Sequence, residues 1–221
     1  MNTWDDMQFW SSKEWEIVQE RLDKDIFNPA RESIFAAFDA TPLDKVKVAI
    51  LGQDPYPDPR LATGLAFSIP EDIQGFPPTL DTIFKEYCND LHLPYPSSGD
   101  LRPWCSRGVF LYNVIPTCDS YRSLSNDWPE WSVLSREVVE TLCKEGVVIV
   151  LLGRKARELR DIVNYYEVLT PKENILIELC HPSTRAIANA KTEAKFLGSR
   201  LFSRANEALV TLGRGTIDWR L

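Results

Sequence analysis

One stretch of the chain, Val46 to Arg60 with the sequence VKVAILGQDPYPDPR, constrains the fold more than any other. Its first half is apolar and rich in β-branched residues, which is typical of a strand buried on both faces of a parallel sheet. Its second half begins at Gly52 and contains three prolines, which exclude both a strand and a helix. The stretch therefore predicts a rigid loop at the carboxyl end of a buried strand, where open α/β sheets bind their ligands.

Asp54 lies in this loop, between Gln53 and Tyr56. A carboxylate that is held by stiff backbone beside apolar neighbours is a candidate general base. An aspartate that only caps a turn fits the same local pattern. The loop by itself leaves both interpretations open.

Two other polar residues follow buried apolar segments in the same way. Asn113 ends the segment GVFLYN, and its amide offers a donor and an acceptor side by side, which suits the edge of a nucleobase. Capping of a turn is the competing interpretation. His181 follows the apolar segment 174–180, where a buried structural histidine is the alternative to a ligand-binding one. A fourth strand, predicted over 147–152, ends at Gly153.

Strands that alternate with helical patterns predict an α/β fold. We expect a single domain over residues 1–221, with a central, mostly parallel four-stranded sheet flanked by helices. Within it, residues 1–44 form an acidic, helical N-terminal part and residues 45–219 form the core that carries the motifs. Ser12 is the expected N-cap of a first helix, and Asn28-Pro29 is expected to open a second. Later helices are expected over 79–90, 132–144, 154–164 and 193–211.

The net charge of −7 argues against a general affinity for nucleic acid, but the charge is uneven. Residues 1–44 hold ten acidic and four basic side chains, so this segment carries −6 and the rest of the chain −1. Residues 151–215 hold eleven basic and seven acidic side chains. A phosphate-binding face is therefore expected in the later half, with weak and salt-sensitive binding.

The five cysteines are far apart and form no C-x-x-C pair, which argues against structural zinc and a disulfide framework. We expect no metal and no cofactor. The chain shows no apolar run of membrane-spanning length and no signal peptide, so an intracellular, reducing, cytoplasmic setting without a membrane is expected.

Five motifs in order resemble those of family 1 uracil-DNA glycosylases. They are GQDPY at 52–56 with GLAFS at 64–68, GVFLYN at 108–113, VIVLLG at 148–153, HPS at 181–183, and a C-terminal part from 196 to 219. The resemblance covers residues 46–219 and implies removal of uracil from DNA by hydrolysis of the N-glycosidic bond, after the base has left the stack. This reaction opens base excision repair.

The resemblance also assigns roles to residues. Asp54 and His181 are implied as catalytic, Asp54 for the attacking water and the sugar cation, and His181 for the uracil anion. The pocket is implied to consist of Gln53, Tyr56, Phe67 and Asn113; Phe67 would stack on uracil, although aromatic side chains are usually core. Contacts to DNA are implied for Pro77, Pro78, Gly153, Arg154, Ser183, Thr184 and Arg185. For the prolines a helix entry, and for the arginine a solvated helix face, are the alternatives.

The sequence departs from the family at three places. Pro57 replaces a usual histidine, Arg154 replaces a usual serine, and Thr184-Arg185 replaces a Pro-Leu pair whose leucine wedges into the duplex. Loss of the wedge leads us to hypothesise weaker extrusion from duplex DNA and a preference for single strands.

The expected partner is uracil-containing DNA, single- or double-stranded, bound by a monomer. Proteins that mimic DNA inhibit members of this family, so such an inhibitor is a second candidate partner. Two other functions remain as alternatives: a glycosylase for another modified base, signalled by Pro57, and a non-catalytic DNA-binding relative. Tyr56 and Asn113 argue against the first, and Asp54 with His181 against the second.

Overall fold

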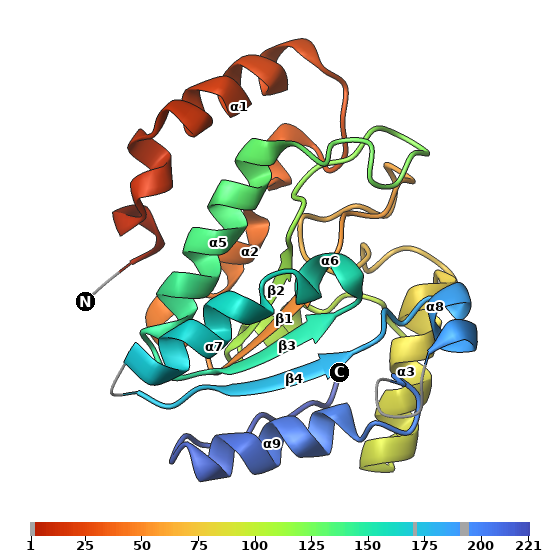
Figure 1. Ribbon diagram of the computed structural model, residues 1–221. Coiled ribbons are helices and arrows are strands. Elements are labelled where there is room, and N and C mark those ends of the chain that lie inside the picture. The colour runs from red at the N-terminus through yellow and green to blue at the C-terminus, as the bar shows by residue number, and fades with distance from the viewer. Residues whose placement is uncertain (1–2, 170–171, 191–194) are drawn as a thin grey trace.

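The computed structural model describes residues 3–169, 172–190 and 195–221 of the chain. Four strands form one sheet (Figure 1): β1 (Val48–Gly52), β2 (Val109–Asn113), β3 (Val148–Leu152) and β4 (Ile175–Leu179). Their order across the sheet is β2-β1-β3-β4, and every neighbouring pair is parallel. Every residue of the first three strands is buried, as their apolar composition predicts. The predicted α/β fold with a four-stranded, parallel sheet is confirmed.

Helices cover both faces of the sheet. On one side α5 packs against α1 and α7, and on the other α9 packs against α3, β3 and β4 (Figure 1). The helices are α1 (Lys13–Lys24), α2 (Ala36–Ala40), α3 (Pro78–Leu91), α4 (Arg102–Cys105), α5 (Pro129–Cys143), α6 (Arg154–Arg157), α7 (Arg160–Leu169), α8 (Thr184–Asn189) and α9 (Leu201–Thr211). Short 3₁₀ helices span Trp4–Asp6, Gln8–Ser11, Arg31–Ser33 and Leu43–Lys45.

Ser12 caps α1 as predicted, because its hydroxyl accepts the backbone N–H of Trp15. The prediction that Asn28-Pro29 opens a second helix is wrong. Asn28 instead pairs as a short bridge with Cys118, exchanging backbone hydrogen bonds of 2.7 and 3.0 Å, and helical structure resumes only at Arg31. The extended pairing with a distant segment prevents a helix from starting there.

Two later helices also differ from prediction. The segment 154–164 contains two helices, because α6 ends at Arg157 and α7 begins at Arg160. The helix expected from residue 193 begins at Leu201; residues 193 and 194 lie outside the described residues. Before it, the buried carboxylate of Glu86 accepts the backbone N–H groups of Gly198 and Arg200, so these groups are satisfied without a helix.

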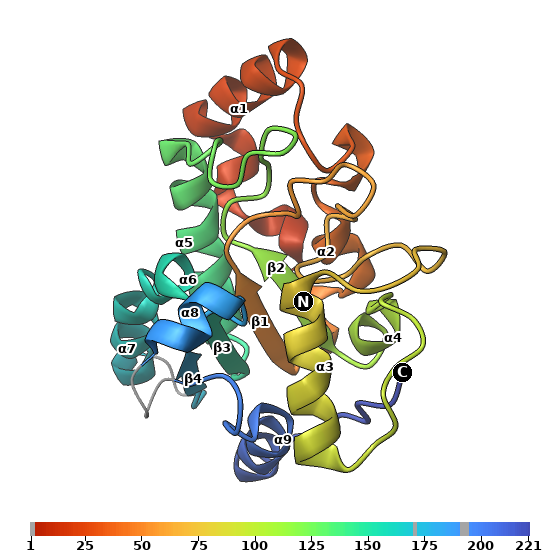
Figure 2. The same ribbon diagram turned by 90° about the vertical axis from the view of Figure 1, so that its right-hand side faces the viewer.

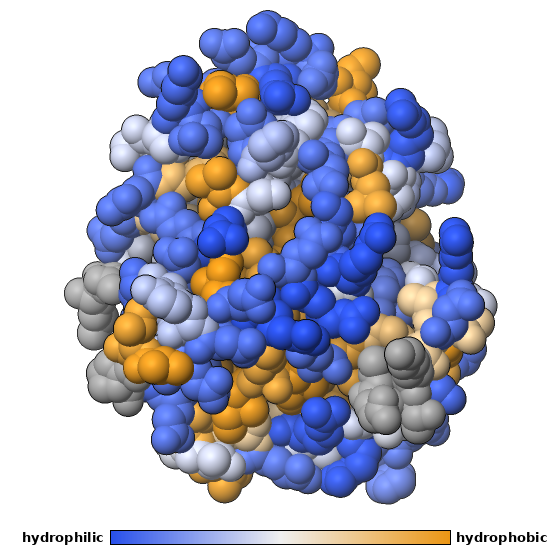
Figure 3. Space-filling model, viewed as in Figure 1, coloured by the Kyte–Doolittle hydropathy of each residue, from blue (hydrophilic) through white to orange (hydrophobic). Residues whose placement is uncertain are grey.

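The surface shown in Figure 3 is mostly polar, with apolar side chains in small groups. One group consists of Tyr165, Val168 and Leu169 on α7, which are 62%, 85% and 58% exposed. In Figure 1, α7 lies on the side of the molecule opposite α8, so this group is remote from the carboxyl ends of the strands. Among the described residues, no helix has the length and apolar character to cross a membrane.

Candidate active site

Asp54 occupies a loop at the carboxyl edge of the sheet, the edge that faces the viewer in Figure 2. Both oxygens of its carboxylate are held. Gln53 donates its Nε2–H to Oδ1 at 2.9 Å, while the Ser123 hydroxyl and the Leu124 backbone N–H each donate to Oδ2 at 2.7 Å. Three donors fix the orientation of the carboxylate. No sequence signal pointed to Ser123 or Leu124, since the segment between Cys118 and Trp131 has no clear periodicity.

The Asp54 loop is itself supported from two distant parts of the chain. The carbonyl of Pro57 accepts hydrogen bonds from the Tyr121 backbone N–H at 2.7 Å and from Asn28 Nδ2 at 2.8 Å. Asn28 is buried, and Cys118 lies buried beneath the loop. The acidic N-terminal part therefore helps to hold the candidate site.

Tyr56 and Phe67 form one wall of the site. The Tyr56 hydroxyl donates to the Phe67 carbonyl at 3.1 Å, which fixes the phenol ring against the segment that follows. Burial raises the pKa of Tyr56 above its ordinary value, so the phenol stays neutral. Phe67 adopts a left-handed backbone conformation with a φ of 68°, which is costly for a bulky residue and common at functional sites.

Asn113 ends β2 directly opposite Gly52, the last residue of β1. A Cβ atom on Gly52 would lie 2.9 Å from Asn113 Oδ1 and 2.9 Å from Phe67 Cζ, so only glycine allows this approach. Asn113 is 6% exposed, and no described residue hydrogen-bonds its side-chain amide. An amide without a protein partner keeps its donor and its acceptor available to a ligand.

His181 follows β4, and its ring lies near that of Phe67, with 5.9 Å between ring centroids. Its Nδ1 accepts the backbone N–H of Ser183 at 3.2 Å, so the proton of the neutral imidazole belongs on Nε2. Burial lowers the pKa of His181 below its ordinary value of 6.5, and the negative charge of Asp54 opposes part of that shift. A neutral imidazole that donates from Nε2 is the result.

Gly153 lies directly against the side chain of His181. A Cβ atom on Gly153 would lie 2.9 Å from that of His181, and the φ of Gly153 is 90°. Its backbone N–H donates to the Leu179 carbonyl at 3.0 Å and so is occupied. Any contact of Gly153 with DNA stays a prediction, and it would involve another atom than this N–H.

A cavity of about 830 Å³ brings most of these side chains together. Asn113 and Gly153 are not among its lining residues, and neither are Pro77 and Pro78, which lie at the N-terminus of α3. The cavity is lined by Gln53, Asp54, Pro55, Tyr56, Pro57, Phe67, Thr79, Ser123, Arg154, His181, Ser183, Arg185, Ala186 and Asn189.

The rim of this cavity is basic. Arg154 and Arg185 are exposed, and no described residue forms an ion pair with either guanidinium. Ser183 acts as the N-cap of α8 by accepting the Ala186 N–H at 3.4 Å, and Thr184 is exposed beside it. The rim therefore offers unpaired positive charge to an anionic ligand.

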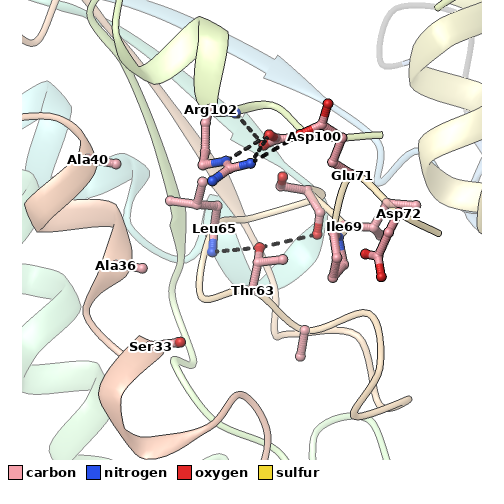
Figure 4. Close-up of a pocket in the computed structure, with 13 residues that line it drawn as sticks. Ser33, Ala36, Ala40, Thr63, Leu65, Ile69, Glu71, Asp72, Asp100 and Arg102 are labelled. Atoms are coloured by element: carbon pink, nitrogen blue, oxygen red, sulfur yellow. Dashed lines mark hydrogen bonds and ion pairs between the residues drawn. The ribbon is translucent and has the colours of Figure 1, made fainter. Parts of the chain in front are cut away.

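A second cavity, of about 660 Å³, lies between α2 and the segment 62–72 (Figure 4). Its charged side chains are mainly acidic, and its one arginine, Arg102, pairs with Asp100 at 2.5 Å and with Glu71 at 3.7 Å. An acidic, internally paired cavity does not suit an anion, so the candidate chemistry belongs to the first cavity. Within the described ranges, no group of three or more His, Cys, Asp or Glu is placed to hold a metal ion.

Comparison with known proteins points in one direction. The family model described as "Uracil DNA glycosylase superfamily" matches residues 38–210. A uracil-DNA glycosylase of Mycolicibacterium vanbaalenii is 39% identical over 204 residues, which cover 91% of this chain and 84% of the relative. A uracil-DNA glycosylase of Campylobacter lari is 38% identical over 200 residues, covering 90% and 81%.

Solved structures share the fold. The crystal structure of mimivirus uracil-DNA glycosylase has a TM-score of 0.79 and 24% identity, and covers 96% of this chain and 86% of that one. A variant of mimivirus UNG in complex with UGI has a TM-score of 0.83 at 24% identity, covering 98% and 87%.

The protonation of His181 is directly testable. We expect its imidazole to titrate below 6.5 in a proton NMR titration, because burial disfavours the charged form. The Asp54→Asn variant should lower the midpoint further, since it removes the charge that favours protonation. Since the folded state binds this proton more weakly than the unfolded state, the contribution of His181 to stability declines as the pH falls below 6.5.

A His92→Gln variant identifies the signal, because the chain has only two histidines. A His181 midpoint at or above 6.5 would contradict the assignment of a neutral donor.

Proposed function

The chain belongs to the uracil-DNA glycosylase superfamily, and we propose that it hydrolyses the N-glycosidic bond between uracil and deoxyribose in DNA. The product is an abasic site, and the reaction is the first step of base excision repair. The observation that carries the proposal is a single cavity in which Asp54 and His181 stand beside Tyr56 and Phe67. A protein that only bound DNA would need neither the fixed carboxylate nor the neutral imidazole.

Asp54 acts on the sugar side of the bond. Its carboxylate orients the attacking water and stabilises the positive charge that develops on the sugar. The hydrogen bonds from Gln53, Ser123 and Leu124 support this role because they hold the charge in place before the reaction. Ser123 is thus a positioning residue.

His181 acts on the base side. As the bond breaks, negative charge gathers on uracil O2, and the Nε2–H of the neutral imidazole donates to that oxygen. The hydrogen bond from Ser183 to Nδ1 supports this assignment because it fixes the tautomer. The close approach of Gly153 keeps the ring in place.

The pocket selects uracil by shape and hydrogen bonding. Asn113 accepts from uracil N3–H and donates to O4, a pattern that cytosine cannot match. Tyr56 occupies the space beside C5 and excludes the methyl group of thymine, and Phe67 stacks on the ring. The absence of a partner for Asn113 among the described residues supports its assignment, because bound uracil would satisfy the amide. Gln53 lines the same cavity.

The DNA itself is held at the basic rim. We propose that Arg154 and Arg185, together with Ser183 and Thr184, contact the phosphates on either side of the extruded nucleotide. Thr79 at the start of α3 also lines the cavity, and we propose that Pro77 and Pro78, which precede it, contact the DNA backbone beside the cavity. The unpaired state of both guanidinium groups supports this assignment.

Three further proposals concern setting and partners. The protein acts as a monomer inside the cell, in a reducing compartment; the five free cysteines, four of them buried, support this. A mimivirus UNG variant has been crystallised with UGI. We propose that an inhibitor protein that mimics DNA would bind this chain at the same basic rim.

The catalytic assignment is tested with Asp54→Asn. This variant should lose uracil release by a factor on the order of 10²–10⁴, because it removes the negative charge that stabilises the sugar cation. Its affinity for uracil-containing DNA should survive, as measured by fluorescence anisotropy.

Asp58→Asn is the matched control. Asp58 belongs to the same loop but pairs with Arg60 at 2.7 Å and does not line the cavity. The Asp58→Asn variant should release uracil at the rate of the unaltered protein. Full activity in Asp54→Asn would refute the assignment.

The strand preference follows from Arg185. Extruding a base from a duplex costs a few kcal/mol, and an apolar wedge in the vacated space offsets part of this cost. Arg185 offers a charged, hydrated side chain instead. Initial rates on matched oligonucleotides should therefore favour the single strand over the duplex by about tenfold.

An Arg185→Leu variant should reduce the difference between the single-strand and duplex rates, because it should raise the rate on the duplex. Faster turnover of the duplex by the unaltered protein would refute the preference.

A further inference from the structure

A groove leads away from the candidate active site, between α6 and α8. Its volume is about 470 Å³, and it is lined by Gly153, Arg154, Arg157, Cys180, His181, Ala186, Asn189 and Ala190. The two hollows are adjacent, because four residues of the groove line the active-site cavity as well: Arg154, His181, Ala186 and Asn189. In Figure 2, α8 is drawn just below α6, and both lie above the ends of β3 and β4. A strand whose nucleotide enters the cavity therefore meets this groove with its neighbouring backbone.

Arg157 is the basic residue that distinguishes the groove from the cavity. It is partly buried, and its Nε donates to the Gly153 carbonyl at 3.4 Å, which holds the guanidinium along the groove. No carboxylate of the described residues pairs with it. A partly desolvated guanidinium without a counter-charge is costly, and an anionic ligand removes that cost.

Three of the described carboxylates near α6 pair with other cations. Asp127 and Glu158 both pair with Lys155, at 2.5 and 3.6 Å. Glu178 pairs with Arg160 at 2.6 Å. These three carboxylates thus neutralise Lys155 and Arg160, and none of them pairs with Arg157.

Among the described residues, no carboxylate pairs with Arg154, Arg157 or Arg185, which line these two adjacent hollows. Guanidinium groups bind phosphate through two parallel hydrogen bonds, and the repeating anion of a DNA strand matches a row of them.

We propose that this groove is a phosphate subsite for the strand that carries the uracil, with Arg157 as its principal contact. The subsite binds a phosphate beyond those that flank the excised nucleotide. This inference rests on the proposed function, since it takes the cavity as the uracil site. It follows that Arg157 contributes to affinity for longer strands and not to the chemical step.

The test compares an oligonucleotide trimer with uracil at its centre and a strand several times longer, using Arg157→Gln. On the long strand, kcat/KM should fall by about tenfold, the effect of one lost charge-assisted contact, with kcat unchanged. On the trimer, kcat/KM should stay as in the unaltered protein. The salt dependence of binding to the long strand should weaken by about 0.7 in slope, the share of one phosphate on a single strand.

Arg136→Gln is the matched control, because Arg136 is exposed on α5, has no ion pair within the described ranges and lines neither hollow. The Arg136→Gln variant should leave kcat/KM unchanged on both substrates. Arg157→Lys retains the charge and should recover most of the loss.

If Arg157→Gln lost kcat/KM equally on both substrates, or lost none on the long strand, the proposed subsite would be overturned. The salt dependence is also measured by binding to a long strand without uracil, which requires no catalysis. Absence of uracil release by the unaltered protein would therefore count against the proposed function alone, while an unchanged binding slope in Arg157→Gln would count against the subsite.

Discussion

Parallel pairing of the strands is the constraint on which the candidate site depends. β1, β2 and β4 come from distant parts of the chain, yet their parallel alignment delivers Gly52, Asn113 and His181 to one edge of the sheet. Burial of the strands on both faces fixes their register, because a shift would expose apolar side chains or bury polar ones. The small size of Gly52 and Gly153 then lets Asn113, Phe67 and His181 approach the strand ends closely. The sheet thus acts as a rigid base for groups that belong to the loops after its strands, such as the proline-rich loop of Asp54.

Charge is organised locally, which reconciles an acidic chain with an anionic substrate. Most carboxylates near the site have assigned cationic or backbone partners, as in the pairs Asp58–Arg60 and Asp127–Lys155. Asp54 is the carboxylate presented to the cavity, and its partners are neutral donors, so its negative charge is oriented without being cancelled. Burial keeps His181 neutral in the same space. Positive charge is confined to the rim, where phosphates pass, so local charge, more than the net charge of −7, governs how DNA meets the site.

Sequence patterns predicted the parts of the structure that depend on neighbours in the chain. Apolar runs marked all four strands, and polar residues just beyond or at their ends marked Asp54, Asn113 and His181. Features that depend on distant partners escaped prediction. Ser123 meets Asp54 across 69 positions, and Glu86 meets Gly198 across 112, so neither hydrogen bond leaves a local trace. The bridge of Asn28 to Cys118 likewise overrode a plausible helix start.

The central claim is that this cavity releases uracil and no other base. The most direct measurement is base release from oligonucleotides that contain uracil, thymine opposite guanine, hypoxanthine or 5-hydroxymethyluracil, detected as alkali-labile strand breaks. Release confined to uracil is the predicted result, because Tyr56 excludes substituents at C5 and Asn113 matches the uracil edge. Release of another base in preference to uracil, or no release of any base by folded protein, would contradict the claim.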